Sequence, residues 1–150
     1  MQRKPPWRMI IAALAAAWLP LSAAAEFRTV SEEAAVLYDA PSAQSKKLFI
    51  VNQGYPLEVI VVVEGWLKVR DASGALTWVE ARQVAGKQRT VMVKTPVAQV
   101  RQNADDNAAV VFQAQQNVIL DLVEVAGGWL RVRHRDGQTG YIKVAQVWGV

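Results

Sequence analysis

Residues 65–79, GWLKVRDASGALTWV, return as residues 128–142, GWLRVRHRDGQTGYI, at a constant offset of 63 positions. In each copy a glycine precedes a short run of alternating apolar and polar residues, and a polar turn with a second glycine leads into another such run. Alternation with a period of two is the pattern of a half-buried β-strand, and glycine is typical of the tight turns that join strands. Each copy therefore predicts a β-hairpin, and the chain contains this hairpin twice.

The repeat extends well beyond the hairpin, because the offset of 63 holds from Ala35 to Val84. Residues 80–84 are too few for an ordinary helix and indicate a single 3₁₀ turn, and no helical periodicity longer than two turns follows residue 27. The expected strands, separated by turn residues, cover residues 35–38, 47–51, 57–63, 66–70 and 76–79 in the first copy and 97–101, 109–114, 118–125, 129–133 and 139–142 in the second.

These runs predict an all-β protein with two similar units, residues 27–84 and residues 97–148. Residues 85–96 are expected to form a linker and a joining strand. Within them, residues 89–93 have strand character and could pair with the edge of either unit. Residues 28–30 match residues 89–91 at an offset of 61, so two residues have been added after the second of these segments.

The tryptophans are expected to supply much of the stability of such small units. A unit of about 60 residues buries only about 60% of its unfolded surface. A tryptophan ring contributes on the order of 200 Å² of contact area, which corresponds to several kcal/mol at about 25 cal/mol per Å². We therefore assign Trp66 and Trp129 to the structural core and expect alanine at either position to unfold its unit.

The N-terminal 25 residues have the layout of a secretory signal peptide. Arg3, Lys4 and Arg8 precede an apolar run that begins at Met9, and small residues end at Ala25, the expected cleavage site. The alternative is an uncleaved membrane anchor, but the run of 17 residues from Met9 to Ala25 is shorter than the roughly 20 residues that a span needs. The protein is thus expected in the periplasm or outside the cell, without a stable membrane span after cleavage.

The composition narrows the function classes. Three of the 17 basic residues lie in the expected signal peptide, which leaves 14 against 13 acidic residues. A nearly neutral mature chain argues against nucleic-acid binding, which requires a concentrated basic surface. The absence of cysteine from the sequence excludes disulfides, zinc–cysteine sites and a thiol nucleophile.

The chain from residue 27 to residue 148 resembles a tandem pair of bacterial SH3 domains. The resemblance rests on residues 54–60 (GYPLEVI), residues 65–71 (GWLKVRD) and the later Gly74, Trp78 and Val79, with residues 88–91 (QRTV) similar to a strand found after the first barrel in one subfamily. It implies five-stranded SH3-like β-barrels, a cell-envelope location and a non-catalytic binding role. The first unit departs from the family pattern at Thr77, where glycine is usual.

No residue pattern indicates catalysis, a metal site or a cofactor. The single histidine, His134, is weighed as a general base, but a solvated turn residue explains it better, since no suitable nucleophile accompanies it. The adjacent pair Asp105 and Asp106 suits a loop tip. Asp71 and Asp136 suit turns, where aspartate bonds to nearby backbone amides.

Two groups of residues are candidates for ligand binding. Arg131, Arg133 and Arg135 alternate on one strand and are expected on one face, where they either form a solvated surface or bind an anionic envelope polymer or an acidic partner loop. Tyr38, Tyr55 and Trp78 come from regions that face one groove in SH3-like barrels, and only Tyr141 corresponds in the second unit. They are expected either to line a peptide groove or to form part of the barrel wall.

The leading hypothesis is an exported, non-enzymatic protein that recognises cell-wall peptides, peptidoglycan or a periplasmic protein. The alternative is a structural protein–protein interaction subunit whose barrels pair through edge strands, without a wall ligand. A third hypothesis is a regulatory accessory to a wall hydrolase. If a specific ligand exists, the two units are expected to treat it differently, because their basic residues differ most.

Overall fold

The computed structural model describes residues 24–85 and 88–150, apart from the side chain of Ala85. Residues 1–23, which include almost all of the expected signal peptide, lie outside the described residues. Within the described residues no helix is both long enough and apolar enough to cross a membrane.

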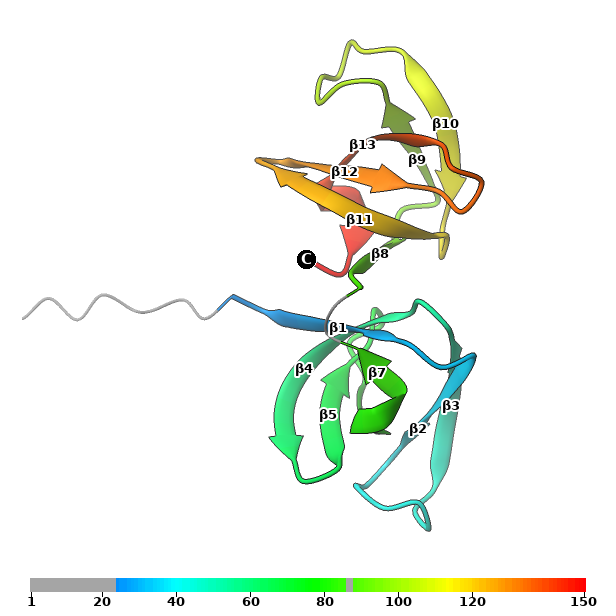
Figure 1. Cartoon of the computed structure of the whole chain (residues 1–150), viewed down its shortest axis with the longest axis vertical. Helices are drawn as coiled ribbons and strands as arrows, with labels where there is room; N and C mark the ends of the chain where they lie inside the picture. The colour runs from blue at the N-terminus through cyan, green and yellow to red at the C-terminus, as the bar shows by residue number, and fades with distance from the viewer. Residues whose placement is uncertain (1–23, 86–87) are drawn as a thin grey trace, which may run out of the picture.

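Unit 1, residues 24–85, is a single antiparallel sheet that curls around its own core (Figure 1). The strands pair in the order β3-β2-β6-β5-β4-β1-β7, so that β3 and β7 form the two edges. The elements are β1 (Glu26–Val30), β2 (Ala34–Tyr38), β3 (Lys47–Asn52), β4 (Pro56–Val63), β5 (Trp66–Arg70), β6 (Leu76–Glu80), the 3₁₀ turn η1 (Ala81–Gln83) and β7 (Val84–Ala85).

Unit 2, residues 88–150, repeats this order of pairing as β10-β9-β13-β12-β11-β8-β14. Its elements are β8 (Thr90–Val93), β9 (Val97–Arg101), β10 (Val110–Gln115), β11 (Ile119–Ala126), β12 (Trp129–Arg133), β13 (Thr139–Lys143), η2 (Val144–Gln146) and β14 (Val147–Trp148). The predicted all-β duplication is confirmed, including the five expected strands in each unit and the 3₁₀ turn after the last of them. Two further strands join each sheet: β1 and β7 in unit 1, and β8 and β14 in unit 2.

The joining segment takes part in the second sheet. Strand β8 pairs with β11 and β14, just as β1 pairs with β4 and β7 in unit 1. The expected addition of two residues is wrong, because the offset of 63 continues through β1 and β8. Phe27 pairs with Glu58 and Thr90 pairs with Asp121, so both partners in unit 2 lie 63 positions after those in unit 1.

The two cores are aliphatic. In unit 1 the cluster includes Leu37, Leu57 and Leu67, and in unit 2 it includes Leu120 and Leu130, all almost fully buried. These residues alternate with outward residues along each strand, as the period-two pattern predicts.

The assignment of Trp66 and Trp129 to the structural core is wrong. Both rings are only partly buried, and neither belongs to the two core clusters. The reason is the strand alternation itself: the neighbouring Leu67 and Leu130 point inward, so the tryptophan before each of them must point to the other face of the sheet.

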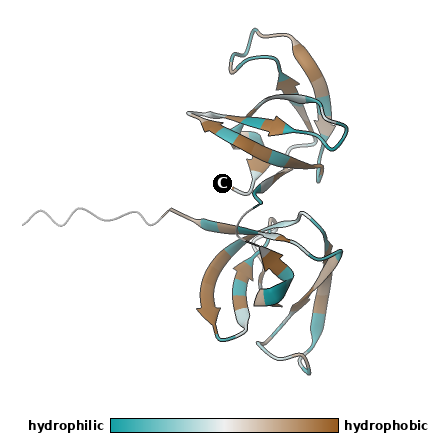
Figure 2. Ribbon diagram, in the orientation of Figure 1, coloured by the Kyte–Doolittle hydropathy of each residue, from teal (hydrophilic) through white to brown (hydrophobic). Residues whose placement is uncertain are grey.

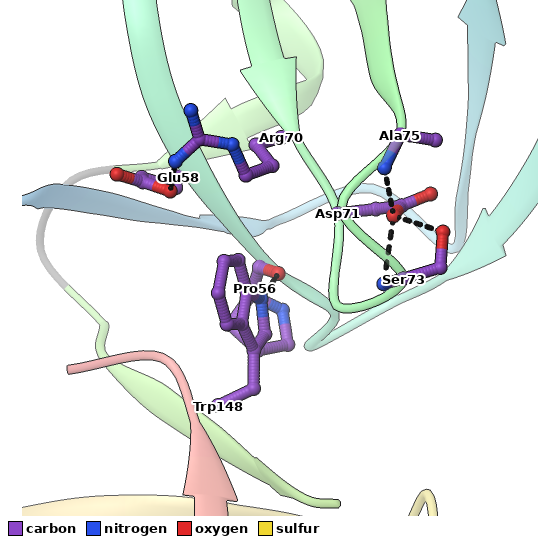
Figure 3. A network of polar contacts seen from close by, with 7 residues as sticks. All are labelled: Pro56, Glu58, Arg70, Asp71, Ser73, Ala75 and Trp148. Carbon is purple, nitrogen blue, oxygen red and sulfur yellow. Dashed lines mark hydrogen bonds and ion pairs between the residues drawn. The ribbon is translucent and has the colours of Figure 1, made fainter.

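The two units meet along a seam, with the C-terminus between them (Figure 1). The indole Nε1 of Trp148 in unit 2 donates a 3.1 Å hydrogen bond to the Pro56 carbonyl of unit 1 (Figure 3). The Trp148 ring also meets Phe27 edge-on at a centroid distance of 5.1 Å. The hydroxyls of Thr29 and Thr90, one from each unit, lie 3.3 Å apart and are both buried.

Candidate ligand-binding faces

The strands β2, β6 and β5 of unit 1 expose one continuous face, which we call outer face 1. Along β5 and β6 the inward residues are fully buried, while the alternating outward residues are only partly covered or exposed. Register places Lys68 opposite Trp78, and Trp78 opposite Tyr38. Directly opposed residues in antiparallel strands share a face, so these three side chains lie together.

Outer face 1 is aromatic and almost neutral. The Tyr38 ring meets Trp66 edge-on at a centroid distance of 5.4 Å, and the Lys68 ammonium lies 5.9 Å from the centre of the Trp78 ring. Tyr38 is 6% exposed, since its neighbours cover it, whereas both tryptophans remain half-buried. The nearby Arg70 is paired with Glu58 at 2.8 Å (Figure 3). This ridge of flat rings beside one ammonium group suits an extended peptide or another ligand with apolar and polar faces.

The equivalent strands β9, β13 and β12 of unit 2 form outer face 2, which is basic. Tyr141 lies opposite Arg131 and Arg101, and Lys143 lies opposite Trp129. The Lys143 ammonium stands 5.5 Å from the centre of the Trp129 ring and pairs with Asp106. A cavity of about 290 Å³ opens here, and its lining includes Arg101, Asp106, Trp129 and Lys143.

Arg131 and Arg133 follow the alternation of β12, so both point outward from this strand. Strand β12 ends at Arg133, and Arg135 stands in the turn that follows. Arg133 and Arg135 line a cavity of about 300 Å³ at the seam between the units, together with Gln53 and Thr90. The expectation of one strand face shared by all three arginines is therefore wrong for Arg135, because the strand ends before it.

Tyr55 is separated from Tyr38 and Trp78. Its ring packs against the core of unit 1, and its hydroxyl accepts a 3.4 Å hydrogen bond from the Ala72 backbone amide. Burial raises the pKa of Tyr55, and Asp71 adds to this while the bond from Ala72 opposes it. Tyr55 also lines a cavity at the seam, so the structure divides the three expected groove aromatics between two places.

The turn after β5 is held by an aspartate. The Asp71 carboxylate accepts hydrogen bonds from the Ser73 amide at 2.8 Å, the Ser73 hydroxyl at 2.6 Å and the Ala75 amide at 3.0 Å (Figure 3). A carboxylate that caps its own turn has a structural role.

In unit 2 the position of Asp71 is taken by His134, and Asp136 lies two residues further along the turn. The His134 amide bonds to the Gln138 carbonyl just as the Asp71 amide bonds to that of Ala75. The Asp136 carboxylate accepts from the Gln138 amide at 2.9 Å and lies 3.0 Å from Nδ1 of His134. The pKa of Asp136 is lowered, first by the Gln138 bond and then by His134. His134 thus belongs to a turn network.

Among the described residues no group of three or more acidic, histidine or cysteine side chains is placed to hold a metal ion. Four residues of the two outer faces were missed as ligand-binding candidates: Trp66, Trp129, Arg101 and Lys143. For Arg101 and Lys143, the offset of 63 could have indicated this position. It aligns Arg101 with Tyr38 and Lys143 with Glu80, and each of these unit 1 residues lies opposite an outward-pointing tryptophan.

Comparison with known proteins gives a family and a few distant structures. The model of the family described as "Bacterial SH3 domain" matches residues 31–86 and again residues 94–149. No curated protein matches the sequence.

Similar solved structures include NlpC2 from Trichomonas vaginalis (11% identity, TM-score 0.39, 85% of this chain and 49% of that one) and NlpC1 from the same organism (12%, 0.39, 85% and 46%). An NlpC/P60 family protein from Bacillus cereus ATCC 10987 matches at 15% identity and a TM-score of 0.38, over 81% of this chain and 55% of that one. The chain spans about half the length of these proteins.

With TM-scores this low, the structural matches support no inference about the function of this chain. The family model, in contrast, covers most of the chain in two copies that coincide with the two sheets. Bacterial SH3 domains are generally binding modules. The chain therefore belongs to the bacterial SH3 domain family, as a tandem pair.

Proposed function

We propose that this chain is a non-catalytic envelope protein that binds cell-wall peptides or peptidoglycan through its outer faces. The observation that carries the proposal is the exposed aromatic ridge of outer face 1. The Tyr38 ring contacts Trp66 edge-on, and the Lys68 ammonium lies over the Trp78 ring. A structural role alone does not require two partly exposed tryptophans on this face, since the core beneath them is already filled with aliphatic side chains.

The N-terminal sequence also supports this proposal, because it indicates export. The basic segment, apolar run and small residues before Glu26 have the layout of a signal peptide. Bacterial SH3 domains are typically periplasmic or extracellular, which places a protein of this family near the cell wall. The ligand would therefore meet the outer faces in the envelope.

The test is retention of the mature protein on purified sacculi. Trp78→Ala is expected to reduce retention about tenfold, the usual scale for losing an aromatic anchor from a binding site. Phe49→Ala is the control, because it also removes an aromatic ring, one that is 51% exposed on the edge strand β3, away from outer face 1. Full retention of the Trp78→Ala protein would contradict the proposal.

A second candidate function rests on β3 itself. This edge strand pairs only with β2 and exposes Leu48, Phe49 and Ile50, the last at 71%. An exposed, apolar edge is a template for pairing with a strand of another chain. In unit 2 the position of Ile50 is taken by Gln113, and the edge strand β10 exposes only the smaller Val110 and Val111 among its large apolar residues, at 42% and 38%.

On this alternative the chain is an interaction subunit without a wall ligand. Cross-linking in the periplasm would then capture one protein partner, and Phe49→Glu would abolish the cross-link while Trp78→Ala would not. Phe49→Glu and Trp78→Ala therefore distinguish the two hypotheses. Wall binding predicts that Trp78→Ala is the harmful change, and the interaction-subunit hypothesis predicts that Phe49→Glu is.

A further inference from the structure

The seam between the units contains a groove that the outer faces do not use. Three cavities of about 300, 580 and 520 Å³ adjoin along it, and Ile119 lines all three. The first and third share Gln53 and Arg135, and the second and third share Asn52 and Asn117. We call this continuous space the seam groove. Its volume is in the range of small-ligand and peptide sites.

Two equivalent turns face each other across the seam groove, and both are rich in carboxamides. The end of β3 and the turn after it contribute Asn52 and Gln53, and the turn between β10 and β11 contributes Gln116 and Asn117. A carboxamide offers one acceptor and two donor hydrogens, which matches the alternating C=O and N–H groups of an extended peptide.

Asn117 is the most informative of these residues. Its φ is +69°, in the left-handed region, whereas the equivalent residue in unit 1 is Gly54 with a φ of +85°. Glycine adopts this conformation freely, and asparagine tolerates it better than most other residues do. Gly54 leaves room for Ile119, whose Cγ2 atom lies 3.4 Å from where a Cβ would stand, while Asn117 adds a polar side chain to the groove.

The seam groove is also positively charged. Arg133 and Arg135 line its first cavity, and neither forms an ion pair with a carboxylate among the described residues. The one carboxylate in that lining is Asp121, which is 3.5 Å from the Gln88 side-chain amide. Lys94 lies at the far end, in the second cavity. Two arginines at one end and a lysine at the other suit a ligand with spaced negative charges.

We propose that the seam groove binds an acidic peptide in an extended conformation. Arg133 and Arg135 hold one of its carboxylates, the carboxamides of Asn52 and Asn117 bond to its backbone, and Ile119 packs against its apolar atoms. The site requires both units and is separate from the outer faces. The proposal can therefore be tested independently of the wall-binding proposal.

The test is calorimetric titration of the mature chain with a blocked acidic peptide, acetyl-(Gly-Glu)₃-amide, against its (Gly-Gln)₃ counterpart. The acidic peptide is expected to bind, and more weakly as salt is added. The double variant Arg133→Gln with Arg135→Gln is expected to weaken binding at least about tenfold, because a charged hydrogen-bond partner is lost. Asn117→Gly keeps the backbone conformation and is expected to weaken binding about fivefold, the usual scale for one hydrogen bond.

Arg82→Gln is the matched control, since it removes the same charge from an exposed arginine of η1 that lines none of the three cavities, and it is expected to bind as the unaltered chain does. Equal weakening by Arg82→Gln would overturn the proposal, as would full binding by the double variant or no binding at millimolar peptide. An oligogalacturonate of equal charge that binds as tightly, with no effect of Asn117→Gly, would overturn the assignment to a peptide. Trp78→Ala, which tests the wall-binding proposal, leaves the seam groove unchanged.

Discussion

Outer face 1 and outer face 2 occupy the same strands in the two units, yet they carry different chemistry. The outward residues of unit 1 are Tyr38, Trp66, Lys68, Trp78 and Glu80, and those at the equivalent positions of unit 2 are Arg101, Trp129, Arg131, Tyr141 and Lys143. One tryptophan is kept, one aromatic residue moves from tryptophan to tyrosine, and the charge rises from nearly neutral to strongly positive.

The inward positions show the opposite behaviour. Leu67 and Val69 are matched by Leu130 and Val132, and all four are fully buried. The duplication has thus kept the residues that build each core and changed those that face outward. Under the proposed function, binding specificity lies in the outward set, and the two units are expected to contribute different contacts.

The largest expected loss of stability comes from Gly140, which occupies the same buried position in unit 2 as Thr77 does in unit 1. A Cβ at Gly140 would lie 2.7 Å from the Arg101 carbonyl oxygen and from Val100, whereas unit 1 accommodates Thr77 at the same position. Gly140→Ala should therefore destabilise unit 2 by about 3 kcal/mol, as overpacking against backbone does, measured by urea denaturation. Gly128→Ala is the control, since nothing lies within 4 Å of its Cβ position; an equal loss in both variants would contradict the account.

The tryptophans provide the next test. Because Trp66 is half-buried and braced by Tyr38, Trp66→Ala should cost about 2 kcal/mol and leave unit 1 folded. Trp129 lies beside a cavity and lacks a bracing ring, so Trp129→Ala should cost only about 1 kcal/mol. Thermal unfolding followed by circular dichroism measures both. Loss of the folded unit in either variant would restore the core assignment made from the sequence.

Thr77 offers a smaller effect in the opposite direction. Its side chain is 1% exposed, and its hydroxyl has no hydrogen-bond partner in the described residues. Thr77→Val keeps the shape and removes the unsatisfied oxygen, so it should stabilise unit 1 by about 1 kcal/mol. Urea denaturation would show a raised midpoint with an unchanged slope, and a lowered midpoint would indicate that the hydroxyl is bonded in solution.

The smallest effect concerns the turn of unit 2. The folded-state pKa of Asp136 lies below its ordinary value of 3.8, so its contribution to stability is present above 3.8 and is lost as the pH falls through the folded pKa. His134→Ala should raise the NMR titration midpoint of Asp136 only part of the way towards 3.8, because the stronger bond from the Gln138 amide remains. A midpoint that does not move would remove His134 from the network.

The sequence was sufficient for the fold because its information is local and repeated. The alternation in residues 66–70 and 129–133 sets which residues point inward, and the offset of 63 then places each of the five expected strands twice. The same alternation, applied strictly, also shows that Trp66 points away from Leu67. The core assignment failed because size and hydrophobicity were given more weight than strand direction.

The sites were harder to predict, because they depend on where strands end and how the units meet. Arg135 leaves the arginine face because β12 ends at Arg133. Tyr55 lies at the seam because the turn before β4 faces unit 2 across a contact between residues far apart in the sequence, such as the Trp148 bond to Pro56. Neither fact has a signature in local residue spacing.

The most direct test of unequal outer faces is to follow the indole N–H signals of Trp66, Trp78, Trp129 and Trp148 by NMR while soluble peptidoglycan fragments are added to the mature chain. The account predicts that Trp66 and Trp78 shift with little dependence on salt, and that Trp129 shifts only at low salt, since its face is basic. Trp148, whose indole is bonded to Pro56 at the seam, should stay in place. Identical salt dependence for all three outer-face signals, or no shift in any of them, would contradict it.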